Sequence, residues 1–337
     1  MPRLQDVARR AGVSTATVSR CLNEPGKVSP GTRERVMAAV RELGYAPNFG
    51  ARALAARRTG IFGAVIPTME NAIFARGLQA FQEALEGDGI TLLVASSSYD
   101  PRREEEQIRT LIARGADALL LIGHDRTPES YALLERRGIP HVVAWAYDPA
   151  AARLSVGFDN RKVMHELALQ VLALGHRLLG LITAERAHND RARLRHEGLV
   201  EAIAAQGLGA ESLAVVETTY SIANGAEAFA RLMRERPETT AVLCGNDVLA
   251  AGALTRAREM GIRVPEQVSI TGFDDIDIAA ITVPALTTVH VPHRAMGREA
   301  ARALMAMSRG EDPGPSVDLG ATIRWRGSLA APGASRR

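Results

Sequence analysis

The sequence predicts an α/β chain in two parts. A small N-terminal unit of three helices is joined by a short helical linker to a larger body of two doubly wound parallel sheets. Residues 1–46 show apolar residues at helical spacing only, whereas from residue 61 onward short apolar runs alternate with amphipathic helical patterns. At 337 residues the chain is also longer than one hydrophobic core usually fills.

The first two predicted helices are separated by a tight turn. Apolar residues recur at helical spacing up to a break at Gly12, namely Leu4, Val7, Ala8 and Ala11. Ser14 then stands as an N-cap, and the buried face of the next helix is marked by Val18, Cys21 and Leu22. A third helix begins at Ser29 and Pro30 and ends at Gly44. This arrangement predicts a helix-turn-helix, whose second helix enters the major groove of DNA.

The charge of the chain is unevenly distributed. Residues 1–60 hold 11 Lys or Arg residues against four acidic ones, while the remaining residues hold 30 basic and 34 acidic side chains. A basic segment attached to a slightly acidic body indicates that the N-terminal part binds a polyanion. We therefore expect double-stranded DNA as a partner of residues 1–60.

The N-terminal motifs resemble a known family. DVA, AGVS, TVSR, LN, VS, TR, ELGY and PN stand in that order within residues 6–48. This run resembles, nearly residue for residue, the headpiece of the LacI/GalR (lactose-repressor) family of transcriptional regulators. The resemblance implies a repressor whose operator affinity is controlled by a small effector molecule.

By this resemblance, three residues of the second helix meet base edges. Arg20 is the strongest candidate because a guanidinium can bond guanine O6 and N7 together, while Thr15 and Ala16 offer a hydroxyl or a methyl group. Phosphate contacts are expected from Thr17, Ser19, Asn23, Thr32, Tyr45 and Asn48. Ordinary solvent exposure is the alternative for each of these residues.

The linker, residues 47–59, contains the Ala-rich run NFGARALAARR. A helix of about ten residues is seldom stable alone, so it can fold when two copies meet on DNA. In the resembling family this segment is a hinge helix that enters the minor groove, with a leucine wedged between base pairs. Leu54 stands at that position and Arg52 can contact phosphate, although Leu54 can also be a linker residue that packs on the body.

The body, residues 60–330, is expected to form two interleaved lobes. Strands are predicted at 61–67, 91–96, 118–122, 141–145, 178–183, 214–217, 241–245 and 268–273. Helices between them include 104–114, 161–174 and 248–260. We expect the chain to cross between the lobes near residues 160 and 290, and residues 331–337 to form a disordered tail.

The body motifs extend the family resemblance. They are VGFDN (156–160), LGHR (174–177), NDRARLRHEG (189–198), GNDVLAAGAL (245–254), VPEQVSITGFDD (264–275) and PALTTV (284–289). The family in turn resembles periplasmic sugar-binding proteins in fold. A ligand is then expected between the lobes, beyond the carboxyl ends of the strands.

Residues near predicted strand ends are the candidates for binding that effector. Arg195 and Asp274 match the family's ligand-binding arginine and aspartate, and Arg191 adds a charge. The other candidates are Asp190, Asn246, Phe74, Trp145, Tyr147 and Tyr220. Each aromatic residue can instead be plain core.

The effector class is narrowed but not fixed by the sequence. Trp145 replaces a frequent aspartate of the family. The segments SYDPRREEEQ and WAYD resemble gluconate-repressor-like members, and two arginines suit a carboxylate, so a sugar acid is one expectation. A neutral sugar, a related polyol or a nucleoside stays open.

Other functions are weighed against this interpretation. The chain contains no phosphate-binding loop of the G-x-x-x-x-G-K-[ST] type and no G-x-S-x-G elbow. His290 and His293 do not suggest a metal site, and Cys21 and Cys244 suggest neither a disulfide nor a metal site. We therefore expect neither an enzyme nor a cofactor. The alternative is a small-ligand-binding protein used in transport or chemotaxis without a DNA function.

Assembly and location follow from the same interpretation. One headpiece reads half a site, so a homodimer on a pseudo-palindromic operator is expected. The C-terminal residues lack the heptads of a tetramerising coiled coil. No apolar run reaches the length of a membrane span and no signal peptide is evident, so we expect a cytoplasmic protein without membrane contact.

Overall fold

The computed structural model describes residues 2–46, 58–70 and 72–333. The chain separates into two compact units, Met1–Thr59 and Gly60–Arg337, and each has a hydrophobic core of its own. The predicted hinge helix falls largely on residues outside the described part. Asn48, Arg52 and Leu54 are therefore not placed by the structure.

The first unit, the headpiece, contains three α-helices and a short 3-10 turn among its described residues. They are α1 (Leu4–Ala11), α2 (Thr15–Asn23), η1 (Pro25–Lys27) and α3 (Pro30–Leu43). The Ser14 hydroxyl accepts a hydrogen bond from the Thr17 amide at 3.1 Å, which starts α2 as predicted. Ser29 stands at the N-cap of α3, but its hydroxyl donates to the Thr32 hydroxyl at 3.0 Å and caps no backbone amide.

The first lobe of the body, the N-lobe, is built on a six-stranded parallel sheet in the order β11-β5-β4-β3-β1-β2. The strands are β1 (Ile61–Ile66), β2 (Thr91–Ser96), β3 (Ala118–Ile122), β4 (His141–Ala144), β5 (Ser155–Gly157) and β11 (Val317–Asp318). The faces are covered by α5 (Ala72–Glu86) with α13 (His293–Arg309), and by α6 (Pro101–Ala113) with α7 (Pro128–Arg137). Side chains of β1 alternate between these two layers, since Phe62 and Ala64 pack in one core and Ile61 and Val65 in the other.

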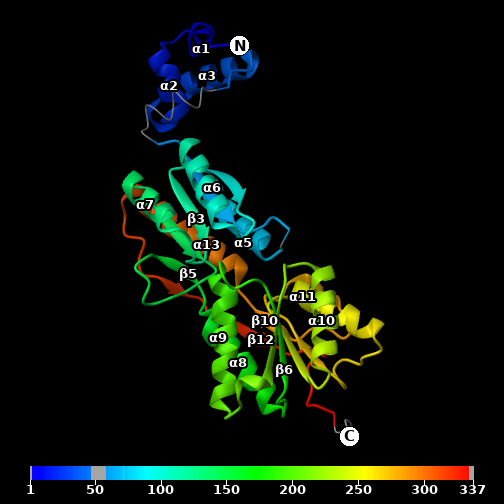
Figure 1. Cartoon of the computed structure of the whole chain (residues 1–337). Helices are drawn as coiled ribbons and strands as arrows, with labels where there is room; N and C mark the ends of the chain where they lie inside the picture. Colours follow the sequence, from blue (N-terminus) through cyan, green and yellow to red (C-terminus); the bar gives the residue numbers. More distant parts are fainter. Residues whose placement is uncertain (1, 47–57, 71, 334–337) are drawn as a thin grey trace. The chain divides into compact units, whose positions relative to one another are not determined.

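The second lobe, the C-lobe, is built on a four-stranded parallel sheet in the order β7-β6-β8-β9. Its strands are β6 (Leu179–Thr183), β7 (Leu213–Glu217), β8 (Ala241–Cys244) and β9 (Ser269–Thr271). Its helices are α8 (Asn160–Ala173), α9 (Asp190–Ala205), η2 (Ala210–Ser212), α10 (Ile222–Glu235), α11 (Asp247–Glu259) and α12 (Asp277–Ile281). Helices α8 and α9 pack together, as do α10 and α11. The two lobes are drawn one below the other in Figure 1.

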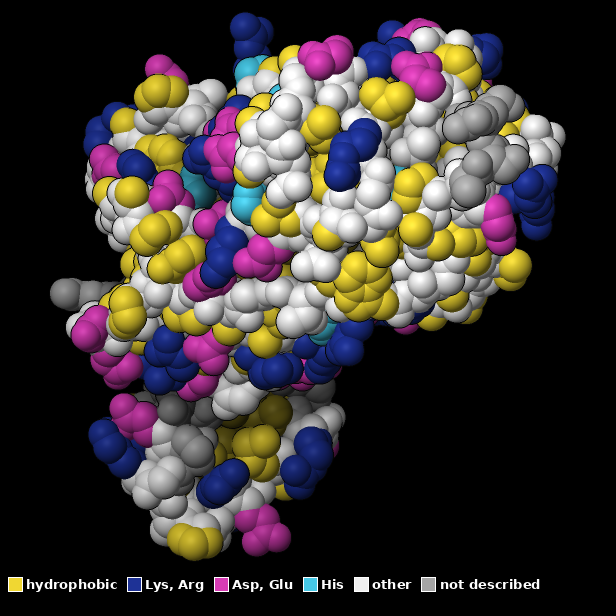
Figure 2. Space-filling view, turned by 90° about the horizontal axis from the view of Figure 1, so that it is seen from below, with side chains coloured by type: hydrophobic (Ala, Val, Ile, Leu, Met, Phe, Trp, Pro, Cys, Tyr) yellow, Lys and Arg dark blue, Asp and Glu magenta, His cyan; other side chains and the backbone are white. Residues whose placement is uncertain are grey.

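The chain passes between the lobes three times. It leaves β5 for α8, returns through β10 (Thr288–His290) to α13, and leaves β11 for β12 (Thr322–Arg324), which pairs antiparallel with β10. One core continues across these passages, where the rings of Phe158 and Phe273 stack 5.9 Å apart. On the face shown in Figure 2, acidic and basic side chains are interspersed.

The predicted fold class is confirmed. All eight predicted strands are present, with ends shifted by at most two residues. Strands β5, β10, β11 and β12 were not predicted, because two or three residues are too few to show an alternating pattern.

Candidate functional site

A small cavity lies between the two lobes and is lined by residues of both. The N-lobe lines it with Ile73, Phe74, Tyr99 and Trp145, and the C-lobe with Asn189, Arg191, Arg195, Tyr220, Asn246 and Asp274. These residues lie after the carboxyl ends of parallel strands in both sheets. This is the edge at which open α/β sheets bind their ligands.

Arg195, on α9, is a buried cation with neutral partners. Its Nε donates to Asn160 Oδ1 at 2.8 Å and its Nη1 to the Gly245 carbonyl at 2.5 Å. The guanidinium carbon lies 3.8 Å from the centre of the Phe273 ring. Within the described ranges Arg195 forms no ion pair, so its charge is available to an anionic ligand.

Arg191 is held by its neighbour in sequence. Its Nη1 donates to the Asp190 carboxylate at 2.7 Å, and that carboxylate also accepts the His124 amide of the N-lobe at 2.5 Å. Arg191 and the His124 amide hold the pKa of Asp190 below its usual value, although burial opposes them. Both side chains lie against Gly123, where a Cβ would overlap them and where φ is +71°. The Asp190 carboxylate therefore links the two lobes through the His124 amide, and of the two residues only Arg191 lines the cavity.

Asp274 is the most unusual group of the cavity. Its side chain is 2% exposed, and neither carboxylate oxygen has a hydrogen-bond partner among the described residues. Burial raises the pKa of Asp274 to about 8, with Arg195 opposing the rise. At neutral pH this carboxyl keeps a proton, so it can donate one hydrogen bond and accept another.

Asn246 also offers a polar atom to the cavity. Its Oδ1 caps α11 by accepting the Leu249 amide at 2.9 Å, while its Nδ2 is buried without a described partner. A buried polar group without a partner costs about 1–3 kcal/mol. Asn246 and Asp274 thus provide unsatisfied hydrogen-bonding groups that a polar ligand can satisfy.

The N-lobe wall is aromatic. The rings of Phe74 and Trp145 meet edge to face at 5.5 Å. Trp145 Nε1 donates to His293 Nδ1 at 3.1 Å, and His293 Nε2 donates to the Asp274 carbonyl at the same distance. Burial lowers the pKa of His293 to about 4, so the imidazole is neutral and links the aromatic wall to the Asp274 loop. A side chain at Gly77 would overlap the indole, which explains the glycine there.

The structure brings seven of the nine predicted effector residues to this cavity. They are Phe74, Trp145, Arg191, Arg195, Tyr220, Asn246 and Asp274. Tyr147 does not line it, because β4 ends at Ala144 and the left-handed Trp145, with φ +60°, turns the chain before Tyr147. Asp190 does not line it either, because its carboxylate is held by Arg191 and the His124 amide.

Three lining residues were missed by the sequence reasoning. Ile73 stands beside the predicted Phe74, and Asn189 opens the NDRARL motif and caps α9 by accepting the Ala192 amide. Tyr99 follows β2 inside SYDP. The position of Tyr99 just after β2 was a signal that could have identified it, whereas Ile73 and Asn189 stand further from the ends of β1 and β6.

The predicted base-reading residues share one surface of the headpiece. Thr15, Ala16 and Arg20 are exposed on α2, while Val18 and Cys21 are buried on its other face. Of the predicted phosphate contacts, four are partly buried, namely Thr17, Ser19, Thr32 and Tyr45. The side chain of Asn23 lies outside the described part.

Neither a metal site nor a membrane span is found in the described residues. No group of three His, Cys, Asp or Glu side chains is arranged to hold a metal in residues 2–46, 58–70 and 72–333. His290 is hydrogen-bonded to Asp275 at 2.9 Å, and His293 bridges Trp145 and Asp274. Across the same ranges, no helix is long and apolar enough to cross a bilayer.

Comparisons with known proteins decide the family. Residues 3–48 match the family of bacterial regulatory proteins called lacI, and residues 168–329 match the periplasmic binding protein-like domain. The HTH-type transcriptional regulator GntR of Escherichia coli K12 is 33% identical over 97% of this chain and 98% of its own length. The chain belongs to the LacI family.

Two solved structures support this assignment. A LacI-family transcriptional regulator from Silicibacter pomeroyi is 30% identical, with a TM-score of 0.87 over 98% of this chain and 100% of its own. The lac repressor dimer bound to operator and the anti-inducer ONPF is 25% identical, with a TM-score of 0.87 over 98% and 99%.

As a LacI-family member, the chain is a DNA-binding transcriptional regulator controlled by a small-molecule effector. It is not an enzyme. The resemblance stated from the sequence is confirmed. The alternative of a transport or chemotaxis protein is not favoured, since residues 3–48 match the family's DNA-binding model.

Proposed function

We propose that this regulator is a cytoplasmic repressor that binds a pseudo-palindromic operator as a homodimer, and that a small sugar acid in the interlobe cavity controls its operator affinity. The observation that carries the effector class is the presence of Asp274 and Arg195 in the same cavity without a bond between them. One is a buried carboxyl without a partner, and the other is a buried cation without an ion pair.

The charge of the cavity supports an acidic ligand. Arg191 is neutralised by Asp190, and Asp274 keeps its proton at neutral pH because burial raises its pKa to about 8. Arg195 is then the unbalanced charge, and a guanidinium suits a carboxylate. Asp274 and Asn246 are left to bind ligand hydroxyls, and the aromatic wall can cover an apolar C–H face.

The headpiece supports the DNA contacts. We infer that Thr15, Ala16 and Arg20 meet base edges, because all three are exposed on α2 while its other face is buried. Leu54 is proposed to enter the minor groove, and phosphate contacts are proposed for Thr17, Ser19, Asn23, Thr32, Tyr45, Asn48 and Arg52.

The homodimer is supported by exposed apolar side chains on the C-lobe. Ile281 and Val283, in and after α12, are 77% and 86% exposed, and Ile222 at the start of α10 is 47% exposed. Contiguous apolar surface marks interfaces, and Ile281 and Val283 stand only two residues apart. Two headpieces are also needed to read both halves of a two-fold site.

The test uses the full-length protein and a thermal-shift panel of gluconate, galacturonate, glucose and adenosine. We expect the acids, and not the neutral compounds, to raise the unfolding temperature, because only an anion neutralises Arg195. A shift with glucose or adenosine equal to that with the acids would contradict the acidic effector class.

A further inference from the structure

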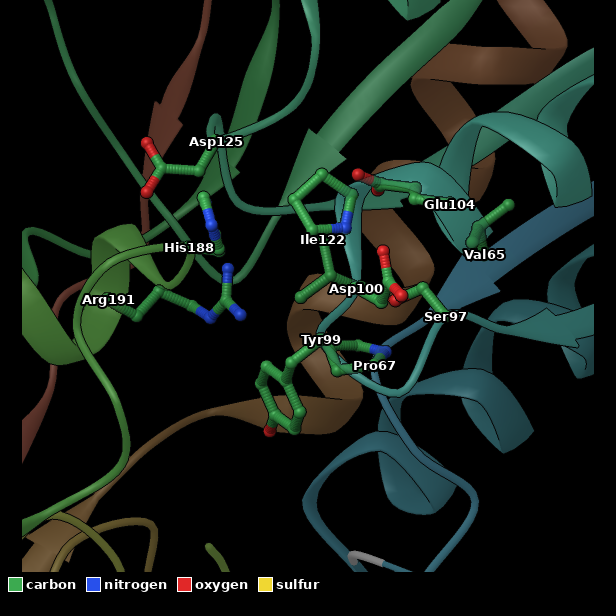
Figure 3. A pocket seen from close by; sticks show the side chains of 11 residues that line it. Val65, Pro67, Ser97, Tyr99, Asp100, Glu104, Ile122, Asp125, His188 and Arg191 are labelled. Atoms are coloured by element: carbon green, nitrogen blue, oxygen red, sulfur yellow. The ribbon is translucent and has the colours of Figure 1, made fainter. Parts of the chain in front are cut away.

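Tyr99 stands where three hollows of the body meet. It lines the buried cavity, a wide mouth that opens to solvent, and a polar side compartment shown in Figure 3. No other residue lines all three of these hollows. Arg191 is shared by the cavity and the side compartment, and Tyr220 by the cavity and the mouth.

Tyr99 and Tyr220 face each other from opposite lobes. Tyr99 follows β2 of the N-lobe and Tyr220 follows β7 of the C-lobe, and their ring centres are 5.8 Å apart at 50°. Since both rings line the cavity and the mouth, this ring pair forms the boundary between the two. Burial raises the pKa of both phenols, so both are neutral at physiological pH.

The backbone fixes the Tyr99 ring in this place. Ser98 and Tyr99 both have left-handed backbone φ angles, of +54° and +61°, which residues other than glycine rarely adopt. The segment is held to the sheet, because the Ser97 amide donates to Ile66 O at 2.9 Å and the Ser98 amide donates to Pro67 O at 2.8 Å. Strained backbone of this kind is found at ligand clamps.

We propose that Tyr99 determines the specificity of the effector site for ligand length. With Tyr220 it separates the cavity from the mouth and so limits how far a ligand held by Arg195 can extend towards solvent: a single sugar acid is accepted and a longer, glycosylated acid is rejected. The proposal rests on the proposed function for the class of ligand, while the closure by Tyr99 can be measured without any ligand.

The ligand-free test measures acrylamide quenching of Trp145, which is 2% exposed and lies in the cavity wall. The Trp325→Phe variant, which removes the exposed second tryptophan, serves as the parent. In that parent, Tyr99→Ala is expected to raise the quenching constant about threefold or more, while Tyr99→Phe leaves it unchanged. Tyr147→Ala, an aromatic residue outside the cavity lining, is the matched control. Equal quenching in Tyr99→Ala and the parent overturns the closure.

The ligand test compares gluconate with maltobionate, which carries one extra hexose on the same acid. By calorimetry, the wild type is expected to prefer gluconate, and Tyr99→Ala to reduce that preference about tenfold while Tyr99→Phe keeps it. An unchanged preference in Tyr99→Ala overturns the role in specificity. If the wild type binds neither acid but quenching responds to Tyr99→Ala, the sugar-acid proposal fails and the closure by Tyr99 stands.

Discussion

The two ends of this regulator present arginines in opposite environments. Arg20 of the headpiece is exposed and forms no ion pair within the described residues, whereas Arg191 and Arg195 of the body are buried and oriented by hydrogen bonds. An exposed cation suits a polyanion such as DNA, whose binding depends on salt. A buried guanidinium has already lost its hydration during folding and suits one small anion.

The largest effect is expected from Arg195→Ala. Removing the unpaired cation should weaken gluconate binding about 100-fold, since a buried charge partner is lost, and should leave operator affinity without ligand unchanged. Calorimetry and fluorescence anisotropy measure the two affinities. Arg231→Ala, on the exposed face of α10, is the control for loss of charge. Normal gluconate binding by Arg195→Ala would remove this arginine from the site.

A smaller effect is expected from Arg20→Ala, which should change DNA binding and leave effector binding unchanged. The ratio of affinities for a selected operator and for random duplex should fall about 10- to 100-fold, because one bidentate base contact is lost. The operator is first selected from randomised duplexes with the wild type. Arg35→Ala, exposed on α3, removes the same charge and should change both affinities alike. Equal losses on operator and random DNA in Arg20→Ala would contradict base reading.

The effect expected from Asp274→Asn is of another kind, because it is on the pH dependence of stability and not on binding. Folding raises the pKa of Asp274 to about 8, so the folded state keeps a proton that the unfolded state has lost above about pH 4. Wild-type stability should therefore fall relative to Asp274→Asn between about pH 4 and pH 8, by at most about 1.4 kcal/mol per pH unit.

Denaturant titrations of both proteins across this range check the prediction. Glu129→Gln, at an exposed position of α7, is the control for removal of an acid and should follow the wild type at all pH values. A pH-independent difference between Asp274→Asn and the wild type would show that Asp274 is ionised in the folded protein at neutral pH.

Much of the fold could be predicted because its signals are local. The N-cap Ser14, the left-handed Gly12 and the eight longer strands follow from short-range spacing. The candidate site was largely predictable for the same reason, since residues such as Asn246 and Asp274 directly follow strands that the sequence shows.

The remaining features depend on contacts between distant segments. Tyr99 lines the cavity only because a left-handed backbone turns it towards Tyr220 of the other lobe. Asp190 is drawn out of the cavity wall by Arg191 and by the His124 amide, which is 66 residues away in the chain. Tyr147 is turned away at Trp145. Spacing along one sequence carries no information on such pairings.

The central claim is that an acid bound between the lobes changes the affinity of the headpieces for DNA. It is tested most directly by the operator dissociation constant of the full-length protein at fixed salt, with and without saturating gluconate, for the wild type and Arg195→Ala. We predict a change of about fivefold or more in the wild type and none in Arg195→Ala. Saturation of the wild type by gluconate with no change in operator affinity would contradict the claim.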